Sequence, residues 1–390
     1  MFRNVVIPLL ILLFASCKNT PSAVDLNQST PTPEDKEAHE DSLALVAAYQ
    51  AQKKIEHTVF ATMETQSVQA SAAEDAADDP AIWVNSKDPS ASLIFGSNKR
   101  GGLAVYDLTG KEVEYYPIGN INNVDIIYDF PLVDKNIIII GCSNRTNQSI
   151  DLFQLNPKNG SLTDISNGIL QVDSTRIDDI YGFTFGQDQQ KNKSYAIING
   201  KNGRMQQFEL IPTPEDQLEL KLLREVQFDS QTEGMATDDK RGFLYVGEEN
   251  RGIWKLQLDP ESGDVKEFLT ASGDTNPNIA FDIEGITFIE HGEKDLLLAS
   301  SQGNFSYAVF TGSGDNSYLS SFKVGSNAGI DGVEETDGLD VVTQYLNEDY
   351  PQGLLVVQDG FNHEGDSLVA QNFKMISWAE VLKDLPQGGK

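Results

Sequence analysis

The sequence is poor in cysteine, histidine and basic residues, and each scarcity excludes a class of protein. Its 390 residues include two Cys and four His, too few for a disulfide framework or a clustered zinc site. Lys and Arg number 29 against 59 Asp and Glu, and this formal net charge of −30 would repel a nucleic-acid backbone. We therefore expect no nucleic-acid partner. The plentiful group is carboxylate oxygen, a ligand that hard cations such as calcium prefer.

The N-terminus has the pattern of an export signal. Arg3 precedes a short apolar core over residues 5–14, and two small residues and Cys17 follow it. This ending is similar to the bacterial lipobox, so we expect residues 1–16 to be a lipoprotein signal peptide and Cys17 to be acylated. The chain would then be lipid-anchored in a bacterial cell envelope and would meet the membrane through that anchor alone. The alternative is an ordinary signal peptide with an incidental Cys.

The segment after the signal differs in composition from the rest of the chain. Residues 17–73 are rich in Thr, Pro, Ser, Gln, Ala and acidic residues, which predicts a flexible polar tether. Within it, residues 35–54 have the composition of a polar helix, although Leu43, Val46 and Tyr49 make only a thin apolar stripe. We expect the folded domain to span residues 74–390, with Cys142 as a buried strand thiol.

Two short motifs recur through this domain. The first, an acidic or aromatic residue at the start of an apolar strand, occurs at residues 79–83, 124–128, 181–185, 233–236, 284–288 and 337–341. The second, an apolar strand that ends in polar residues, occurs at 93–99, 139–145, 195–201, 244–249, 297–302 and 354–359. Six units of about 50 residues, each with three or four strands, predict an all-β fold, a six-bladed β-propeller with antiparallel blades around a channel. A β-sandwich would not explain six repeats in phase.

In such a fold the two motifs meet at one rim of the channel, because the second strand of a blade runs antiparallel to the first. The rim would collect Asp78, Asp79, Glu233, Glu249, Asp282, Glu284, Asp331 and Asp337, together with Lys99, Arg145 and Lys201. Crowded carboxylates raise one another's pKa or recruit cations, and calcium suits them together with the Tyr181 hydroxyl. Cations on three consecutive blades also suit a phosphorylated ligand. The alternative is that they are ordinary solvated turn residues.

Several segments resemble one known family. DAADDPAIW at residues 75–83 is similar to the signature of the β-propeller phytases, and NNVD at 122–125 with YDFPL at 128–132 resembles their second hallmark. QTEGMA at 231–236, DIEG at 282–285, SSQGN at 300–304 and QNFKM at 371–375 continue the match in order. The resemblance extends over about residues 74–382. It implies a calcium-dependent phosphatase that acts on phytate or calcium phytate, by attack of a metal-activated water.

The resemblance also implies roles for individual residues. The catalytic calcium ions would be held by Asp78, Tyr181, Glu233, Glu249, Glu284 and Asp337. The cleaved phosphate would be bound by Lys99, Arg145 and Lys201, with Arg100 on a neighbouring phosphate; the expected catalytic residues are these three cations with Tyr181 and Asp337. Structural calcium sites would be formed by Asp79, Pro80 and Val124, and by Asp331 with Asn362. Asn202 and Phe361 depart from the family pattern, since each stands where relatives carry a Glu. The carbonyl oxygen of Asn202 can still bind a catalytic calcium, though without a charge, whereas Phe361 cannot be a ligand.

Two other functions remain open from the residues. One is a propeller without catalysis, whose carboxylates bind calcium for stability and whose rim binds a carbohydrate or protein. The other is a hydrolytic propeller with a different substrate, such as a lactonase. The three rim cations favour the phosphatase, because a purely structural calcium ring needs no phosphate ligands. A closed propeller gives no reason to expect a multimer, so we expect a monomer.

Overall fold

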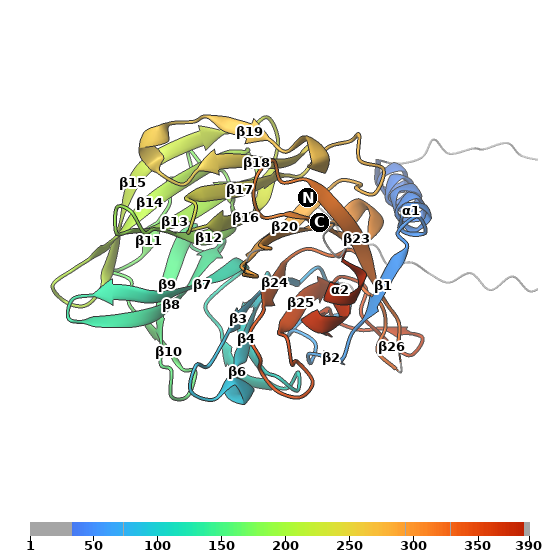
Figure 1. Cartoon of the computed structure of the whole chain (residues 1–390), viewed down its shortest axis with the longest axis horizontal. Helices are drawn as coiled ribbons and strands as arrows, with labels where there is room; N and C mark the ends of the chain where they lie inside the picture. Colours follow the sequence, from blue (N-terminus) through green and yellow to red (C-terminus); the bar gives the residue numbers. More distant parts are fainter. Residues whose placement is uncertain (1–32, 73, 293, 328, 386–390) are drawn as a thin grey trace, which may run out of the picture.

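The repeat units predicted from the sequence form six main sheets around a central channel (Figure 1). The protein is represented by a computed structural model that describes residues 33–385 except 73, 293 and 328. The first strand of each sheet contacts the first strands of both neighbouring sheets, so these strands line the channel. The predicted all-β, six-bladed propeller with antiparallel blades is confirmed.

The first three sheets follow the chain without interruption. The first contains β3 (Ala77–Trp83), β4 (Leu93–Asn98), β5 (Gly102–Asp107) and β6 (Glu112–Tyr116). The second contains β7 (Ile121–Leu132), β8 (Lys135–Asn144), β9 (Ser149–Leu155) and β10 (Leu162–Asp164), with β11 (Leu170–Gln171) paired to β9. The third contains β12 (Ile180–Asp188), β13 (Lys193–Gly200), β14 (Arg204–Pro212) and β15 (Leu218–Gln227).

The last three sheets include two strands from the N-terminal segment. The fourth contains β16 (Thr232–Asp238), β17 (Phe243–Glu248), β18 (Gly252–Gln257) and β19 (Lys266–Phe268). The fifth contains β20 (Ile283–Ile289), β21 (Leu296–Ser301), β22 (Ser306–Thr311), β23 (Tyr318–Gly325) and β1 (His57–Phe60). The sixth contains β24 (Leu339–Val342), β25 (Leu354–Asp359), β28 (Asn372–Ser377) and β2 (Met63–Glu64), and a hairpin of β26 (His363–Glu364) and β27 (Ser367–Leu368) lies beside it.

The hydrophobic core is divided among the junctions between sheets. Six clusters of buried side chains are present, and each joins two neighbouring sheets. Ile139 of β8 and Phe183 of β12, for example, share one cluster. Because a middle strand is covered on both faces, its sequence is apolar almost throughout, as in β25, where all six residues are buried. The ring of sheets therefore holds the channel rim in a fixed geometry.

The N-terminal segment differs from the predicted tether. Strand β1 pairs in parallel with β23, and β2 pairs antiparallel with β28, so this segment completes the fifth and sixth sheets. Val59 and Ala61 are buried there. The folded domain therefore includes residues 57–72 that the sequence assigned to a tether, because strands of two and four residues pair through their backbone and leave no periodic signal. The rest of the predicted tether before residue 33, the signal peptide and Cys17 lie outside the described residues.

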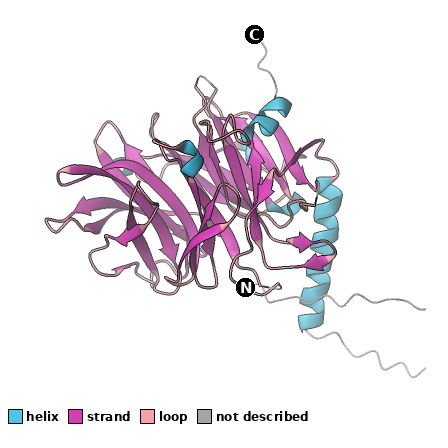
Figure 2. Ribbon diagram, turned by 90° about the horizontal axis from the view of Figure 1, so that it is seen from below, coloured by secondary structure: helices cyan, strands magenta, loops and turns pink. Residues whose placement is uncertain are grey.

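Helix α1 (Pro33–Gln52) lies along the outside of the propeller, beside the fifth sheet (Figure 2). The ring of Tyr49 packs edge-on against Phe305 at 5.3 Å between centroids, and Lys323 Nζ donates to the carbonyl of Gln52 at 3.2 Å. The predicted polar helix is thus present and docked. At the other end, α2 (Trp378–Asp384) follows β28, and four short 3₁₀ turns complete the elements: Pro89–Ala91, Pro260–Ser262, Thr270–Ser272 and Gln302–Asn304. Among the described helices, none has the length and hydropathy that a membrane crossing requires.

Candidate active site at the channel rim

A bulge at the start of the first strand brings one side chain from each sheet to the rim. In five sheets the pairing of the first and second strands shifts over this position. A bulge re-aims the side chains it contains. The first bulge residues are Asp78, Asn122, Tyr181, Glu233 and Glu284, and Asp337 holds the corresponding place before β24. Contacts between distant sheets show the convergence: Asn122 Nδ2 donates to Glu233 Oε1 at 2.7 Å.

Glycine at the second bulge position lets neighbouring sheets approach closely. A Cβ on Gly182 would lie 2.0 Å from the carbonyl oxygen of Glu233, and one on Gly234 would lie 1.9 Å from that of Glu284. No side chain can occupy such a space without moving the backbone. The motif of a functional residue followed by Gly therefore has a steric cause, and it packs the rim residues of successive sheets side by side.

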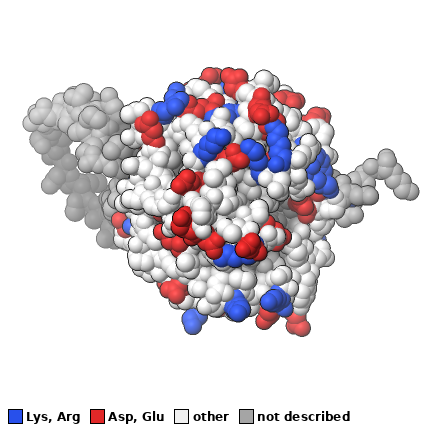
Figure 3. Space-filling model, turned by 90° about the vertical axis from the view of Figure 1, so that its left-hand side faces the viewer, with Lys and Arg blue, Asp and Glu red and all other residues white. Residues whose placement is uncertain are grey.

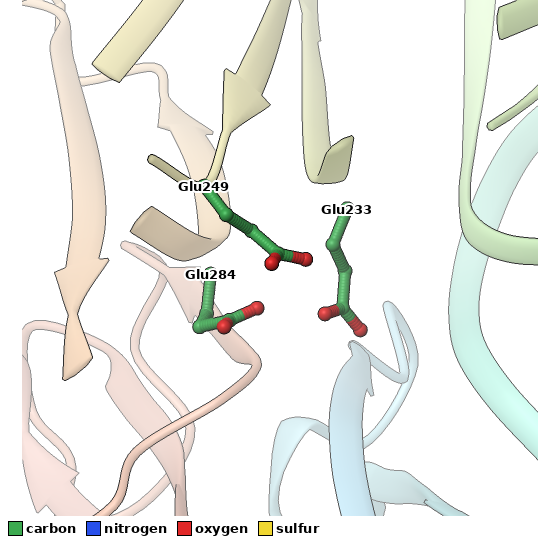
Figure 4. A group of neighbouring side chains, drawn as sticks. All are labelled: Glu233, Glu249 and Glu284. Atoms are coloured by element: carbon green, nitrogen blue, oxygen red, sulfur yellow. The ribbon is translucent and has the colours of Figure 1, made fainter. Parts of the chain in front are cut away.

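Three buried carboxylates form a tight group on this rim. Oxygens of Glu233, Glu249 and Glu284 lie within 4.8 Å of one another, and the three side chains point toward a common centre from adjacent elements (Figure 4). Glu249 Oε1 and Glu284 Oε2 have no hydrogen-bond partner among the described residues. Burial, and then the charge of Glu233, raises the pKa of Glu249 to about 8. Buried oxygens without donors and at this spacing fit a hard cation, which would replace the protons that they otherwise retain.

A second acidic group surrounds the ammonium of Lys99, which is only 6% exposed. Its Nζ lies 2.8 Å from Asp75, 3.3 Å from Asp78 and 3.1 Å from Asp337. Gln302 Nε2 donates to the other oxygen of Asp337 at 2.6 Å. Burial raises the pKa of Asp337 to about 8 although Lys99 acts to lower it. Apart from this ion pair with Lys99, the two oxygens of Asp78 have no hydrogen-bond partner among the described residues. Lys99 thus partly neutralises the charge of Asp75, Asp78 and Asp337.

The remaining cations lie around Tyr181. Lys201 Nζ lies 4.5 Å from the centre of the Tyr181 ring, and the Arg145 guanidinium lies 5.5 Å from it. Arg145 also forms two hydrogen bonds to the carboxylate of Asp179. A polar pocket of about 220 Å³ opens here, lined by Asp75, Lys99, Arg100, Asn120, Arg145 and Asp179. The structure therefore places a pocket with three cations beside the carboxylates of the rim, which suits an anionic ligand.

Comparison with known proteins identifies the family. Residues 38–388 match the family model described as Phytase. A 3-phytase of Bacillus subtilis (strain 168) is 39% identical to this chain over 333 residues, which cover 85% of this chain and 86% of the relative. This chain belongs to the phytase family. The predicted membership in that family is confirmed, and with it the prediction that the protein is an enzyme.

Solved structures similar to this phytase-family chain are more distant. A complex of BBS1N with ARL6DN soaked with lead is 11% identical with a TM-score of 0.42, and the match covers 77% of this chain and 76% of that one. A protein from Lactobacillus plantarum is 13% identical with a TM-score of 0.46, over 76% of this chain and 87% of that one. Neither similarity bears on function.

The other predicted ligands of this phytase-family chain differ in their surroundings. Asp79 Oδ2 accepts the backbone N–H of Val124 at 3.1 Å, so Asp79, Pro80 and Val124 are adjacent in the channel wall. Asp282 is partly buried, and burial raises its pKa. The amide of Asn202 bonds to backbone instead: its Nδ2 donates to the Arg176 carbonyl and its Oδ1 accepts the Arg204 N–H. The side-chain oxygen of Asn202 therefore accepts a backbone hydrogen bond and does not join the carboxylates around Glu233 or around Lys99.

The predicted pair of Asp331 and Asn362 surrounds a lysine. Lys374 is fully buried, and its ammonium contacts Asp331, lies 3.1 Å from Asp359 and donates to Asn362 Oδ1 at 2.9 Å. The structure thus brings Asp331 and Asn362 together, but around the ammonium of Lys374. Phe361 contributes only a backbone N–H near Asp359. Lys374 lies in the QNFKM segment, yet nothing in its sequence context indicates that its ammonium reaches these oxygens.

Proposed function

We propose that this enzyme hydrolyses phytate, the hexakisphosphate of myo-inositol, and that calcium held by the rim carboxylates makes it active. The observation that carries the proposal is the group of Glu233, Glu249 and Glu284, whose buried oxygens lie within 4.8 Å of one another. Asn122 contacts both Glu233 and Arg145, a residue of the cation-lined pocket. A relative that covers most of the chain is named a 3-phytase, which supports the choice of substrate. The buried oxygens Glu249 Oε1 and Glu284 Oε2, which accept no hydrogen bond from the described residues, support the choice of a hard cation.

Calcium at the carboxylates would supply a water of lowered pKa and would neutralise charge on the phosphoryl oxygens. The chain's own residues bind and orient the substrate. Lys99, Arg100 and Arg145 line the pocket. Lys99 and Arg145 would bind the cleaved phosphate, and Arg100 would bind a neighbouring one. Lys201 reaches the same region over the ring of Tyr181. Fixed cations of this kind stabilise charge that grows on the phosphoryl group in the transition state.

The acidic composition makes this function conditional on the metal. The chain has a net charge of −30, and phytate is itself a dense polyanion. Figure 3 shows acidic and basic side chains lying next to one another on one face of the molecule. At the rim, Asp75, Asp78 and Asp337 already engage Lys99, and phosphate must compete with them for its ammonium. Cations that bind these carboxylates would release Lys99 toward the substrate.

The test is phosphate release from phytate by a soluble fragment that begins at residue 33, measured with calcium and with chelator. We expect release that requires calcium. Glu284→Gln should remove most of the activity. The matched change Glu267→Gln should leave it intact, because Glu267 is exposed on β19, the outermost strand of the fourth sheet. Calcium-independent release, or equal activity in both variants, would contradict the proposal. No release under any condition would favour a binding function instead.

We also propose that the protein is a monomer anchored through acylated Cys17 in a bacterial cell envelope. The support is the sequence pattern of residues 1–17 and a closed ring of sheets, which needs no partner to complete it. Replacement of Cys17 by Ser should move the protein from the membrane fraction to the soluble fraction. An unchanged distribution would contradict the anchor.

A further inference from the structure

Asp179 is a pocket residue whose position is fixed by the fold. It lies directly before β12, two residues before Tyr181. Its backbone N–H donates to Asp178 Oδ1 at 2.8 Å, and its carbonyl accepts the N–H of Lys201 at 3.3 Å. The second bond continues the pairing of β12 with β13, so the main chain at Asp179 is tied to the residue that begins the loop after β13. These two bonds fix the backbone position from which the Asp179 side chain extends at the edge of the pocket.

The carboxylate of Asp179 binds one edge of the Arg145 guanidinium. Arg145 Nε donates to Asp179 Oδ1 at 3.2 Å, and a terminal nitrogen donates to Oδ2 at 2.6 Å. Two parallel bonds of this kind set the plane of the guanidinium as well as its place. The other terminal nitrogen is 3.5 Å from Asn122 Oδ1, a weak contact that leaves it available to a ligand. Both partners line the pocket together with Lys99 and Arg100.

Asp179 also neighbours the second cation beside Tyr181. Lys201 Nζ lies 4.0 Å from Asp179 Oδ2 and 4.5 Å from the centre of the Tyr181 ring. Arg145 contacts the same ring, so one carboxylate and one aromatic ring organise both cations. A carboxylate in a pocket for anions opposes binding by its charge. Its presence is explained if the order that it imposes on Arg145 improves binding by more than its charge weakens it.

We propose that Asp179 is a positioning residue for phosphate binding, which acts by holding Arg145 with its free N–H groups toward the pocket. The inference rests on the proposed function, since it concerns how the same pocket binds a phosphate. Asp179 itself does not touch the substrate. Removing its charge while keeping its size should therefore weaken binding, although simple electrostatics would predict tighter binding of an anion.

The test is a double-mutant cycle in the calcium-loaded enzyme with phytate as substrate. Asp179→Asn should raise KM about tenfold and change kcat less than about twofold, because binding is impaired and the rim carboxylates are intact. In an Arg145→Ala background the same change should have no further effect on KM. Asp179→Glu should restore part of the affinity. Asp229→Asn, which breaks the exposed pair of Asp229 with Arg251, is the matched control and should leave KM unchanged.

The outcomes separate this inference from the proposed function. A lower KM in Asp179→Asn, or an equal rise in KM with and without Arg145, would overturn the positioning role. A loss of calcium affinity or of melting temperature in Asp179→Asn would assign it a structural role instead and would also overturn it. If the wild-type enzyme releases no phosphate, the proposed function fails, and the same cycle is measured by equilibrium binding of inorganic phosphate. Unchanged phosphate affinity in Asp179→Asn would then overturn the inference as well.

Discussion

Replacement of Glu249 by Gln should make the calcium-free protein more resistant to rising pH. Burial raises the pKa of Glu249 from 4.5 to about 8 in the folded protein, and only 7% of the residue is exposed. Between these values the folded state retains a proton that the unfolded state releases. The contribution to stability is therefore complete below about pH 4.5 and is lost as the pH rises through about 8. At about 1.4 kcal/mol per pH unit, the loss between about pH 5 and pH 7.5 is on the order of 3 kcal/mol.

The assay is urea unfolding in chelator at these two pH values, followed by both tryptophan fluorescence and circular dichroism. The wild type should lose roughly 3 kcal/mol more of its unfolding free energy than Glu249→Gln over this interval. Glu267→Gln, in an exposed position of the same sheet, should behave as the wild type does. Calcium in excess should abolish the difference, because a bound cation replaces the proton. Equal losses in wild type and Glu249→Gln would refute the reasoning, since Glu249 would then not be a buried carboxyl that retains its proton.

Three further changes test other parts of the structure. Lys99→Met should tighten calcium binding without substrate by about tenfold, because the ammonium no longer competes for Asp78 and Asp337; calorimetry checks this, and unchanged affinity would contradict it. A fragment that begins at residue 67 lacks β1 and β2, and it should melt about 10 °C or more below a fragment that begins at residue 56; similar melting temperatures would show that these strands are dispensable. Gly234→Ala should cost about 3 kcal/mol or more, because its Cβ would lie 1.9 Å from the Glu284 carbonyl oxygen. Gly242→Ala, with nothing within 4 Å, should cost only about 1 kcal/mol for its left-handed backbone; equal losses in the two variants would contradict the close approach at Gly234.

The fold was predictable because its signal is local and repeated. Each sheet has an apolar second strand buried between two neighbours, as in β21 and β25, and that pattern is visible in a single strand. Strands β1 and β2 were not predictable in the same way. They are four and two residues long, and they pair with strands more than 250 residues away. This pairing depends on how the fifth and sixth sheets come together in the folded ring, and the local sequence of β1 and β2 gives no indication of it.

The positions of the rim carboxylates were predictable, and the contacts that support them were less so. Glu233 and Glu284 stand at the same point of a repeated motif, so their convergence followed from the repeat. Asp179 is an ordinary polar residue in the sequence, and its two bonds to Arg145 are apparent only in the structure. Gln302 lies in the second motif, but the sequence does not indicate that its amide donates to Asp337. For Asn202, the sequence identified the position, but the direction of its amide depends on the backbone of the surrounding loop. Residue type and spacing therefore indicate what can bind, whereas orientation requires the structure.

The most direct test of the central claim is a calcium titration of the chelated enzyme with phytate present at constant concentration. Phosphate release is measured at each step, together with the number of calcium ions bound. We predict no release from the calcium-free enzyme and full activity once the rim carboxylates, including Glu233, Glu249 and Glu284, are loaded. Release that is already maximal in chelator, or calcium binding that leaves release at zero, would contradict the claim that calcium at this rim activates the hydrolysis of phytate.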